Sequence, residues 1–409
     1  MGQSNYDLMI LGAGMTGASL VHLLHRAREQ GMRIALLERQ SLNWEADAIE
    51  RPPSFDGRAT ALSWGTRLLL EQMNCWQHIS DRACAIEHIQ VSDHGRFGQT
   101  HLHASEQDTE ALGYIVENAV LGYGLLKDLE STGVTLMPNT QVDAVQMTAD
   151  GASLTLSDGD VLSTRLLVMA DGARSGLAAK LGINHQRQSY GTSAIVTQVK
   201  TDQPHQHWAY ERFSDAGPIA FLPLHQRQFA VVWTLPEETV DDVMALSDED
   251  FLHQLQQQIG HRLGNLMQVG ERATYPLALV RSDEQVRRSL VLLGNAAHSL
   301  HPVAGQGFNL ALRDTAVLAE HLTRAWQAGQ SPGDLSVLQA YAEQQQRDQS
   351  NTIIASDLLP KIFSHPGKLT AIVRDAGLMG LAAVPVARRL LALHAMGLGQ
   401  KAARPGGLS

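Results

Sequence analysis

The chain has 409 residues, of which 44% are hydrophobic and 18% are charged, so its composition is that of a globular protein with two or three domains. A formal net charge of −10 argues against nucleic acid as a partner, and two cysteines are too few for a disulfide framework. The 18 histidines are scattered without an HExxH motif, so no metal site is expected.

The chain contains no apolar stretch of the ~20 residues that a membrane span needs. The first apolar run leads straight into glycines, unlike a signal peptide, so we expect a cytoplasmic protein. Repeats and low-complexity linkers are absent, and the domains are therefore expected to be interleaved along the chain.

The N-terminal residues predict a strand over 8–11, a helix to about residue 30 and a second strand over 34–37. A Gly-x-Gly-x-x-Gly turn joins the first strand to the helix, and an acid closes the second strand. In a dinucleotide-binding fold the glycines make the turn, admit the pyrophosphate and let the helix pack, while the acid accepts ribose hydroxyls. The candidate contacts are Gly12, Ala13, Gly14, Thr16, Gly17, Glu38 and Arg39. This unit predicts a bound dinucleotide.

A second segment, residues 134–182, predicts three or four short alternating strands and then a buried strand that leads into Asp171 and Gly172. A β-meander inserted before the last strand of a dinucleotide fold is not the layout of a plain NAD dehydrogenase. Val142 in the meander, Asp171 and Gly172 are candidate cofactor contacts.

A third segment, residues 290–314, begins with a hydrophobic run over 290–293 that fits an inner strand of a parallel sheet. Small residues and two histidines follow, and an amphipathic helix is predicted from Phe308 to Leu322. Such a strand-to-helix turn presents bare amides and a helix N-terminus, which suit an anionic or electron-rich group.

In combination, the three segments resemble the group A, para-hydroxybenzoate hydroxylase-like FAD monooxygenases. Further segments resemble the ubiquinone-biosynthesis hydroxylases within that group, closest to the 2-polyprenyl-6-methoxyphenol branch. They read FDGRATALSWGT (55–66), ERFSDAGPIAFLPL (211–224), ATYPLALVRS (273–282) and GNAAHSLHPVAGQGFNLALRD (294–314). The resemblance implies FAD as cofactor, NAD(P)H as a transient reductant, O2 as co-substrate and hydroxylation of a polyprenylated methoxyphenol through a C4a-hydroperoxyflavin.

The same resemblance implies that the third segment passes along the isoalloxazine ring, where glycines leave room for it and helix amides face its N1–C2=O edge. The implied cofactor contacts are Arg58, Gly294, Asn295, Pro302, Gly305, Gln306, Gly307, Phe308 and Asn309. His301 is the candidate catalytic residue, and His298 is a weaker one. Two positions depart from the family pattern: Asn295 replaces an aspartate, and Ala178 replaces an arginine.

The implied fold is α/β with α+β elements: a Rossmann-like FAD-binding domain with an inserted β-meander, an interleaved antiparallel-sheet substrate domain and a helical C-terminal tail. We expect the FAD domain to comprise 1–84, 105–182 and 283–340. The substrate domain would comprise 85–104 and 183–282, and the C-terminal helical region 341–409. Apolar side chains of the substrate domain line a pocket or form plain core; they are Phe213, Phe221, Leu222 and Trp233.

The tail is basic, since residues 361–409 hold seven Lys or Arg and one acid, a net charge of +6. It either meets the anionic inner-membrane surface or ubiquinone-biosynthesis proteins, or simply packs across the two domains. Alternative functions also stay open. These are a hydroxylase of another ring position or phenol, a halogenase or prenyl reductase, and a non-catalytic flavin-bound scaffold. The halogenase is disfavoured because its WxWxIP signature is absent.

Overall fold

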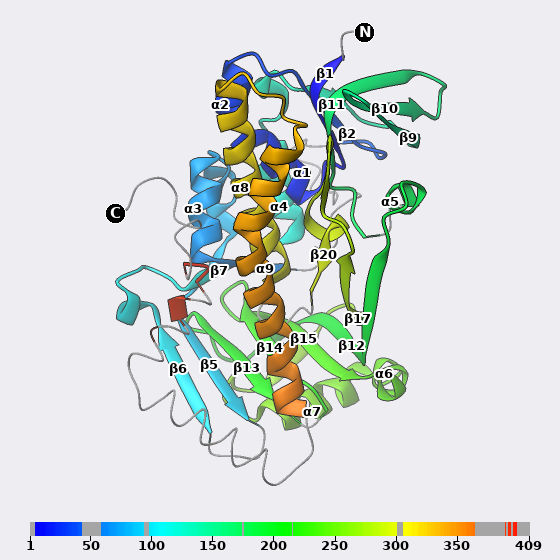
Figure 1. Ribbon diagram of the computed structural model, residues 1–409. Coiled ribbons are helices and arrows are strands. Elements are labelled where there is room, and N and C mark those ends of the chain that lie inside the picture. The colour runs from blue at the N-terminus through cyan, green and yellow to red at the C-terminus, as the bar shows by residue number, and fades with distance from the viewer. Residues whose placement is uncertain are drawn as a thin grey trace.

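The computed structural model describes residues 5–42, 59–93, 98–173, 176–214, 216–300 and 306–364, together with 389, 392–393 and 396–398. Within this part of the chain three β-sheets are present. A long helix extends from the upper of the two larger sheets to the lower one (Figure 1). The α/β fold class predicted from the sequence is confirmed.

An eight-stranded sheet forms the upper part of the molecule in Figure 1. Strands β19, β11, β1, β2 and β8 pair in parallel in that order; β18 pairs antiparallel with β19, and the hairpin β9–β10 continues from β11. The strand bounds are β1 Tyr6–Leu11, β2 Ile34–Leu37, β8 Thr135–Met137, β9 Val142–Thr148, β10 Gly151–Leu156, β11 Val161–Met169, β18 Val286–Arg287 and β19 Leu290–Leu292. The predicted strands at 8–11, 34–37 and 290–293 and the β-meander are therefore confirmed.

Both faces of this sheet are covered, which explains why residues 8–11 of β1 are all apolar. Leu8 and Ile10 pack against helices on one face, whereas Met9 and Leu11 pack against the β9–β10 hairpin and α5 on the other. The helices are α1 Met15–Leu23, α2 His25–Glu29, α4 Asn118–Leu126, α5 Gly176–Lys180 and α8 Gln306–Gln327. The helix predicted to extend to about residue 30 is two helices, α1 and α2, with a break at Leu24.

A nine-stranded sheet forms the lower part of the molecule in the order β20-β17-β12-β15-β14-β13-β5-β6, with β16 beside β12. Its pairs are antiparallel except β13–β5, which is parallel. Helices α6 (Glu237–Met244) and α7 (Asp248–Ile259) cover one face, where Phe221 and Trp233 form plain core with Phe251. The strands are β5 His88–Asp93, β6 Gln99–His103, β12 His185–Thr201, β13 Trp208–Phe213, β14 Ile219–Pro223, β15 Gln228–Pro236, β16 Leu266–Val269, β17 Ala273–Ser282 and β20 His298–Ser299.

A small sheet of β3 (Ala59–Ser63), β7 (Gly113–Glu117) and β4 (Cys84–Ile86) connects the two larger sheets. Alternate residues of β7 point to opposite faces. Val116 packs with the helices beside the eight-stranded sheet, and Ile115 packs with Ala209 and Ala230 of the nine-stranded sheet. Helix α3 (Trp64–Gln72) follows β3 directly. The 3-10 turns are η1 Trp76–His78, η2 Ser80–Arg82, η3 Ala104–Gln107, η4 Glu130–Thr132 and η5 Gly294–Ala296.

The long helix α9 (Leu335–Ser364) runs beside α8 and contacts β18 of the upper sheet and β13 of the lower one (Figure 1). A described part of the basic tail also packs on the body: Ala392 and Met396 are buried against Leu102 and Leu112. Within the described residues, no helix combines the length and the apolarity of a membrane span.

The predicted domain boundaries stay a prediction. Strands of the eight-stranded sheet come from residues 6–37, 135–169 and 286–292, and those of the nine-stranded sheet come from 88–103, 185–282 and 298–299. The two larger sheets are thus interleaved in the chain.

Candidate active site

Residues from all three sequence segments meet at the carboxyl ends of β1, β11 and β19. The N–H of Ala170 donates to the carbonyl of Leu11 (2.8 Å), and the N–H of Leu293 donates to the carbonyl of Met169 (2.9 Å). In an open parallel sheet ligands bind at this edge, so the three segments are placed together where a dinucleotide would lie.

The three glycines of the N-terminal motif have different surroundings. Gly12 has a φ of +96°, and a Cβ there would lie 2.7 Å from the carbonyl oxygen of Ala170. A Cβ on Gly17 would lie 1.9 Å from the carbonyl oxygen of Gly12, so α1 approaches the turn too closely for a side chain. Gly14, in contrast, has no protein atom within 4 Å of such a Cβ. Packing therefore requires glycine at two positions and leaves open space at the third.

The N-terminus of α1 is suited to a phosphate. Gly14 is its N-cap, and no side chain caps the helix. The first-turn N–H groups of a helix lack intrahelical acceptors and carry the positive end of the helix dipole. The open space at Gly14 and these donors fit a pyrophosphate, and Thr16 lies in the same first turn.

Glu38 links the second strand to this turn. Its Oε2 accepts a hydrogen bond from the N–H of Ala13 (2.8 Å), and its Oε1 accepts one from the N–H of Gln40 (3.1 Å). Arg39 is exposed, and Val142 starts β9 partly buried against the sheet core. The carboxylate of Glu38 is thus held beside the glycine motif, where contact with a ribose stays a prediction.

The second and third segments contribute two polar side chains at this edge. Asp171 and Asn295 are both exposed, and Gly172 and Gly294 beside them have φ values of +85° and +60°. The left-handed backbone at these glycines lets the chain turn sharply at the strand ends. The side chains of Asp171 and Asn295 are therefore directed out of the fold, where they are accessible to a ligand.

The first turn of α8 contains Gln306, Gly307, Phe308 and Asn309. The first three are partly exposed, and a Cβ on Gly307 would meet no protein atom within 4 Å. Asn309 differs, because its side chain is buried and fully engaged. Its Oδ1 accepts from the N–H of Ser63 (2.9 Å) and the hydroxyl of Thr66 (2.7 Å), while its Nδ2 donates to the carbonyl of Ala61 (2.9 Å). Its side chain thus holds β3 and α3 against α8, and its backbone amide is the part that can face a cofactor.

Several predicted positions contribute differently or lie elsewhere. Arg58, His301, Pro302 and Gly305 lie outside the described residues. The Nε2 of His298 is 2.7 Å from Oδ2 of Asp314 in a buried pair, so His298 contacts α8 within the core. Ala178 is 3% exposed in the core, so this position offers no contact to NAD(P)H.

Residues 5–352 match the family model described as an FAD binding domain. The chain belongs to the FAD-dependent monooxygenase family. Among curated relatives, the ubiquinone hydroxylase UbiL of Rhodospirillum rubrum is 33% identical over 96% of this chain and 89% of its own length. The human mitochondrial ubiquinone biosynthesis monooxygenase COQ6 is 28% identical over 95% of this chain and 92% of its own.

Solved structures show the same fold for this FAD-dependent monooxygenase. PqsL of Pseudomonas aeruginosa, crystallised with 2-aminobenzoylacetate, has a TM-score of 0.76 at 21% identity and covers 92% of this chain and 99% of its own. The p-nitrophenol 4-monooxygenase PnpA of Pseudomonas putida has a TM-score of 0.76 at 17% identity and covers 98% and 100%.

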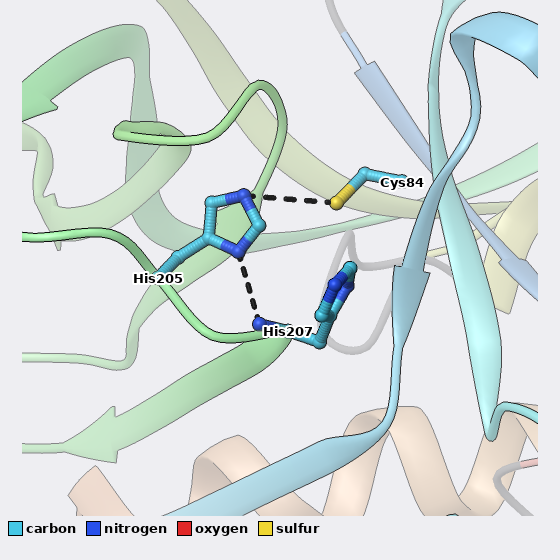
Figure 2. A group of neighbouring side chains, drawn as sticks. All are labelled: Cys84, His205 and His207. Carbon is cyan, nitrogen blue, oxygen red and sulfur yellow. Dashed lines mark hydrogen bonds between the residues drawn. The ribbon is translucent and has the colours of Figure 1, made fainter.

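Two cavities formed by described residues lie apart from the three motifs. One of about 220 Å³ lies between β15 and helices α6 and α7. The other, of about 1060 Å³, lies between β4 and the loops at 204–207 and 224–228. Cys84, His205 and His207 lie in its wall with their potential ligand atoms within 4.8 Å of one another (Figure 2). No local motif predicts this cluster, because Cys84 is far from the two histidines in sequence.

The hydrogen bonds of the cluster disfavour a metal ion. Figure 2 shows the His205 ring between Cys84 and the backbone nitrogen of His207. The His207 N–H donates to Nδ1 of His205 (3.0 Å), so the proton of a neutral His205 is on Nε2, which is 3.8 Å from the Cys84 sulfur. A metal at this nitrogen would need the proton on Nδ1, facing the His207 N–H. Burial also raises the pKa of Cys84 to about 11, which favours the thiol over the metal-binding thiolate.

Proposed function

We propose that the chain is an NAD(P)H-using FAD hydroxylase of a polyprenylated methoxyphenol in ubiquinone biosynthesis. The observation that carries this proposal is the meeting of the three motifs at one sheet edge. It is supported by the likeness of the chain to a ubiquinone hydroxylase and to a ubiquinone biosynthesis monooxygenase over most of their length.

The residues at the edge divide the binding of FAD among them. The α1 N-terminus at Gly14 would hold the pyrophosphate, Glu38 the adenosine ribose, and Asn295 the ribityl chain. The backbone amides of the first turn of α8 would face the electron-rich edge of the flavin, since a helix N-terminus favours negative charge. When bound, FAD supplies the activated oxygen, and the protein positions the phenol and excludes water.

Two measurements test this proposal. The purified protein should release FAD, not FMN, on denaturation. With a methoxyphenol, it should oxidise NADPH or NADH in a substrate-dependent manner and incorporate one atom of isotopically labelled O2 into the product. Mass spectrometry of the product would identify the ring position. Flavin binding without any oxygen incorporation would instead indicate the scaffold function, and absence of flavin binding would overturn both.

We also propose that the basic tail brings the enzyme to its substrate at the membrane surface. Each basic residue near an anionic surface contributes roughly 1 kcal/mol. Arg389 is exposed, and Ala392 close to it is buried in the body, so the charge would be presented by a segment fixed to the enzyme.

The tail proposal predicts that Arg388→Glu combined with Arg389→Glu weakens binding to anionic liposomes. Activity on a short water-soluble phenol should remain. An equal loss of activity on soluble and membrane-borne phenols would show that the tail is a structural brace.

A further inference from the structure

Glu211 lies in the middle of β13 on the face of the nine-stranded sheet that is opposite to α6 and α7. Its register partners are Val91 on β5 and Ala220 on β14. Side chains two residues apart on a strand share a face, so Glu211 lies on the same side as Ala209 and Phe213. Ala209 packs in the layer between this sheet and the small three-stranded sheet. Glu211 therefore lies on the face of the nine-stranded sheet against which the small sheet packs.

The layer around Ala209 adjoins the proposed flavin region through β3. Ala59 and Ala61 of β3 pack against the cluster that contains Ala209. At the end of β3, the N–H of Ser63 donates to Asn309 in the first turn of α8. The sheet face that carries Glu211 thus lies across β3 from the helix terminus assigned to the flavin.

The surroundings of the Glu211 carboxyl group are unusual for a glutamate. The side chain is partly buried, and among the described residues no hydrogen-bond donor or cation pairs with it. Burial alone raises its pKa to about 7. Asp93 lies further along the same face of β5, opposite Phe213, and the long helix α9 also packs against β13. A group that ionises near neutral pH is suited to proton transfer.

We propose that Glu211 is the general base that accepts the phenolic proton of the substrate. This inference rests on the proposed function and adds the identity of the activating group. The phenolic O–H bond breaks, the proton goes to a carboxylate oxygen of Glu211, and the electron pair stays on the phenolate oxygen. The added charge is delocalised to the ortho and para ring carbons, which makes these carbons stronger nucleophiles toward the activated oxygen that FAD would supply. The proton leaves with exchange of product for solvent.

The test uses the FAD-loaded enzyme and two probes: 2-methoxyphenol, a weak acid, and 4-nitrophenol, which ionises near neutral pH. Glu211→Gln keeps the shape of the side chain but cannot accept the proton. We expect it to lower kcat on 2-methoxyphenol by about 100-fold or more with little change in KM. Its remaining activity should rise with pH as the phenol ionises in solution, and oxidation of 4-nitrophenol should be nearly retained. Glu238→Gln, an exposed carboxylate on α6, is the matched control.

A binding measurement supplements turnover. Above neutral pH, binding of 4-nitrophenolate to the wild-type protein should take up a proton at Glu211, because two anions would otherwise lie together. Glu211→Gln should bind it without proton uptake, as followed with an indicator dye. If Glu211→Gln loses FAD, Glu211→Ala with added formate provides the second variant, and formate should restore activity.

The outcomes separate the two proposals. Equal losses on both phenols, unchanged proton uptake or full activity of Glu211→Gln would overturn the assignment of Glu211 while leaving the hydroxylase function intact. Absence of phenol hydroxylation by the wild-type enzyme would overturn the proposed function and the base with it.

Discussion

Gly294 lies directly against Thr16: a Cβ atom on Gly294 would be 2.6 Å from the hydroxyl oxygen of Thr16, and the φ of Gly294 is +60°. The two residues belong to the third and first motifs, which are far apart in the sequence. The contact fixes the distance between the helix that would bind the pyrophosphate and the turn that carries Asn295. Glycine is required at this position by both space and backbone angle.

Gly294→Ala should therefore destabilise the fold. We expect the free energy of unfolding of the FAD-free protein to fall by about 1 to 3 kcal/mol, from backbone strain and contact with Thr16. Chemical denaturation measures this change. Gly307→Ala is the control, because a Cβ there has no protein neighbour within 4 Å, and its stability should be unchanged. Equal stability of the two variants would contradict the close contact.

Gly14 and Gly17 should separate cofactor binding from folding. A Cβ on Gly17 would lie 1.9 Å from the carbonyl oxygen of Gly12, so Gly17→Ala should cost about 2 kcal/mol or more in unfolding free energy. Gly14→Ala should leave the stability of the FAD-free protein unchanged and weaken FAD binding by about tenfold or more. Fluorescence titration with FAD provides the affinity. Unchanged affinity in Gly14→Ala would place the pyrophosphate elsewhere.

The buried carboxylate of Asp314 should be a major stabilising group. It accepts hydrogen bonds from Gln345 (2.7 Å) and Gln349 (2.9 Å) and pairs with His298 (2.7 Å), and it is fully buried. Asp314→Ala leaves these groups without their partner, so we expect a loss of about 3 to 5 kcal/mol in thermal or chemical denaturation.

The control for Asp314 is the exposed pair between Glu320 and Arg324 on the same helix. Glu320→Ala should cost about 0.5 kcal/mol or less, because solvent screens the pair. Similar losses in Asp314→Ala and Glu320→Ala would show that the buried network contributes little.

Cys84 should react slowly with alkylating reagents in the folded protein. Burial disfavours its thiolate and raises its pKa from 9.0 to about 11. The native protein therefore keeps a proton that the unfolded chain loses above about pH 9, so this thiol contributes stability that is lost as the pH rises from about 9 toward 11. The rate of iodoacetamide labelling in a Cys75→Ser variant over this pH range measures the thiolate fraction of Cys84. Rapid labelling near pH 7 would instead indicate a stabilised thiolate and reopen metal or redox roles for the cluster.

The parts of the fold that the sequence predicts are those with short-range signals. The strands at 8–11, 34–37 and 290–293 are continuous apolar runs, which burial on both faces of a parallel sheet produces. The glycine motif is also recognisable from the sequence, because its three glycines lie within one short turn. Gly12 and Gly17 are required by close backbone contacts, and Gly14 leaves open space. The cofactor contact of the Asn309 backbone amide stays a prediction. Its side-chain contacts were not predicted, because the partners on β3 and α3 are over 240 residues away in the sequence.

Glu211 and the Cys84 cluster could not be found from local patterns. The face on which Glu211 lies depends on the parallel pairing of β13 with β5, a register between segments about 120 residues apart. A third segment, β3, packs against Ala209 on the same sheet face as Glu211. Similarly, Cys84 meets His205 only because β4 passes the loop before β13. Such groups become candidates only once strand register is known.

The position of β19 in the eight-stranded sheet also has a consequence for synthesis of the chain. β11 ends at Met169, and its outer neighbour in the sheet, β19, begins at Leu290. On the ribosome the N-terminal half can therefore pair β1, β2, β10 and β11. The edge of β11 at residues 167–169 stays open until β19 has been translated, after β12 to β17 of the nine-stranded sheet. The turn at Asn295 and the start of α8 emerge later still. Flavin capture is thus delayed until about three-quarters of the chain has been made, and nascent chains that stop earlier would carry an uncovered strand edge that chaperones must protect.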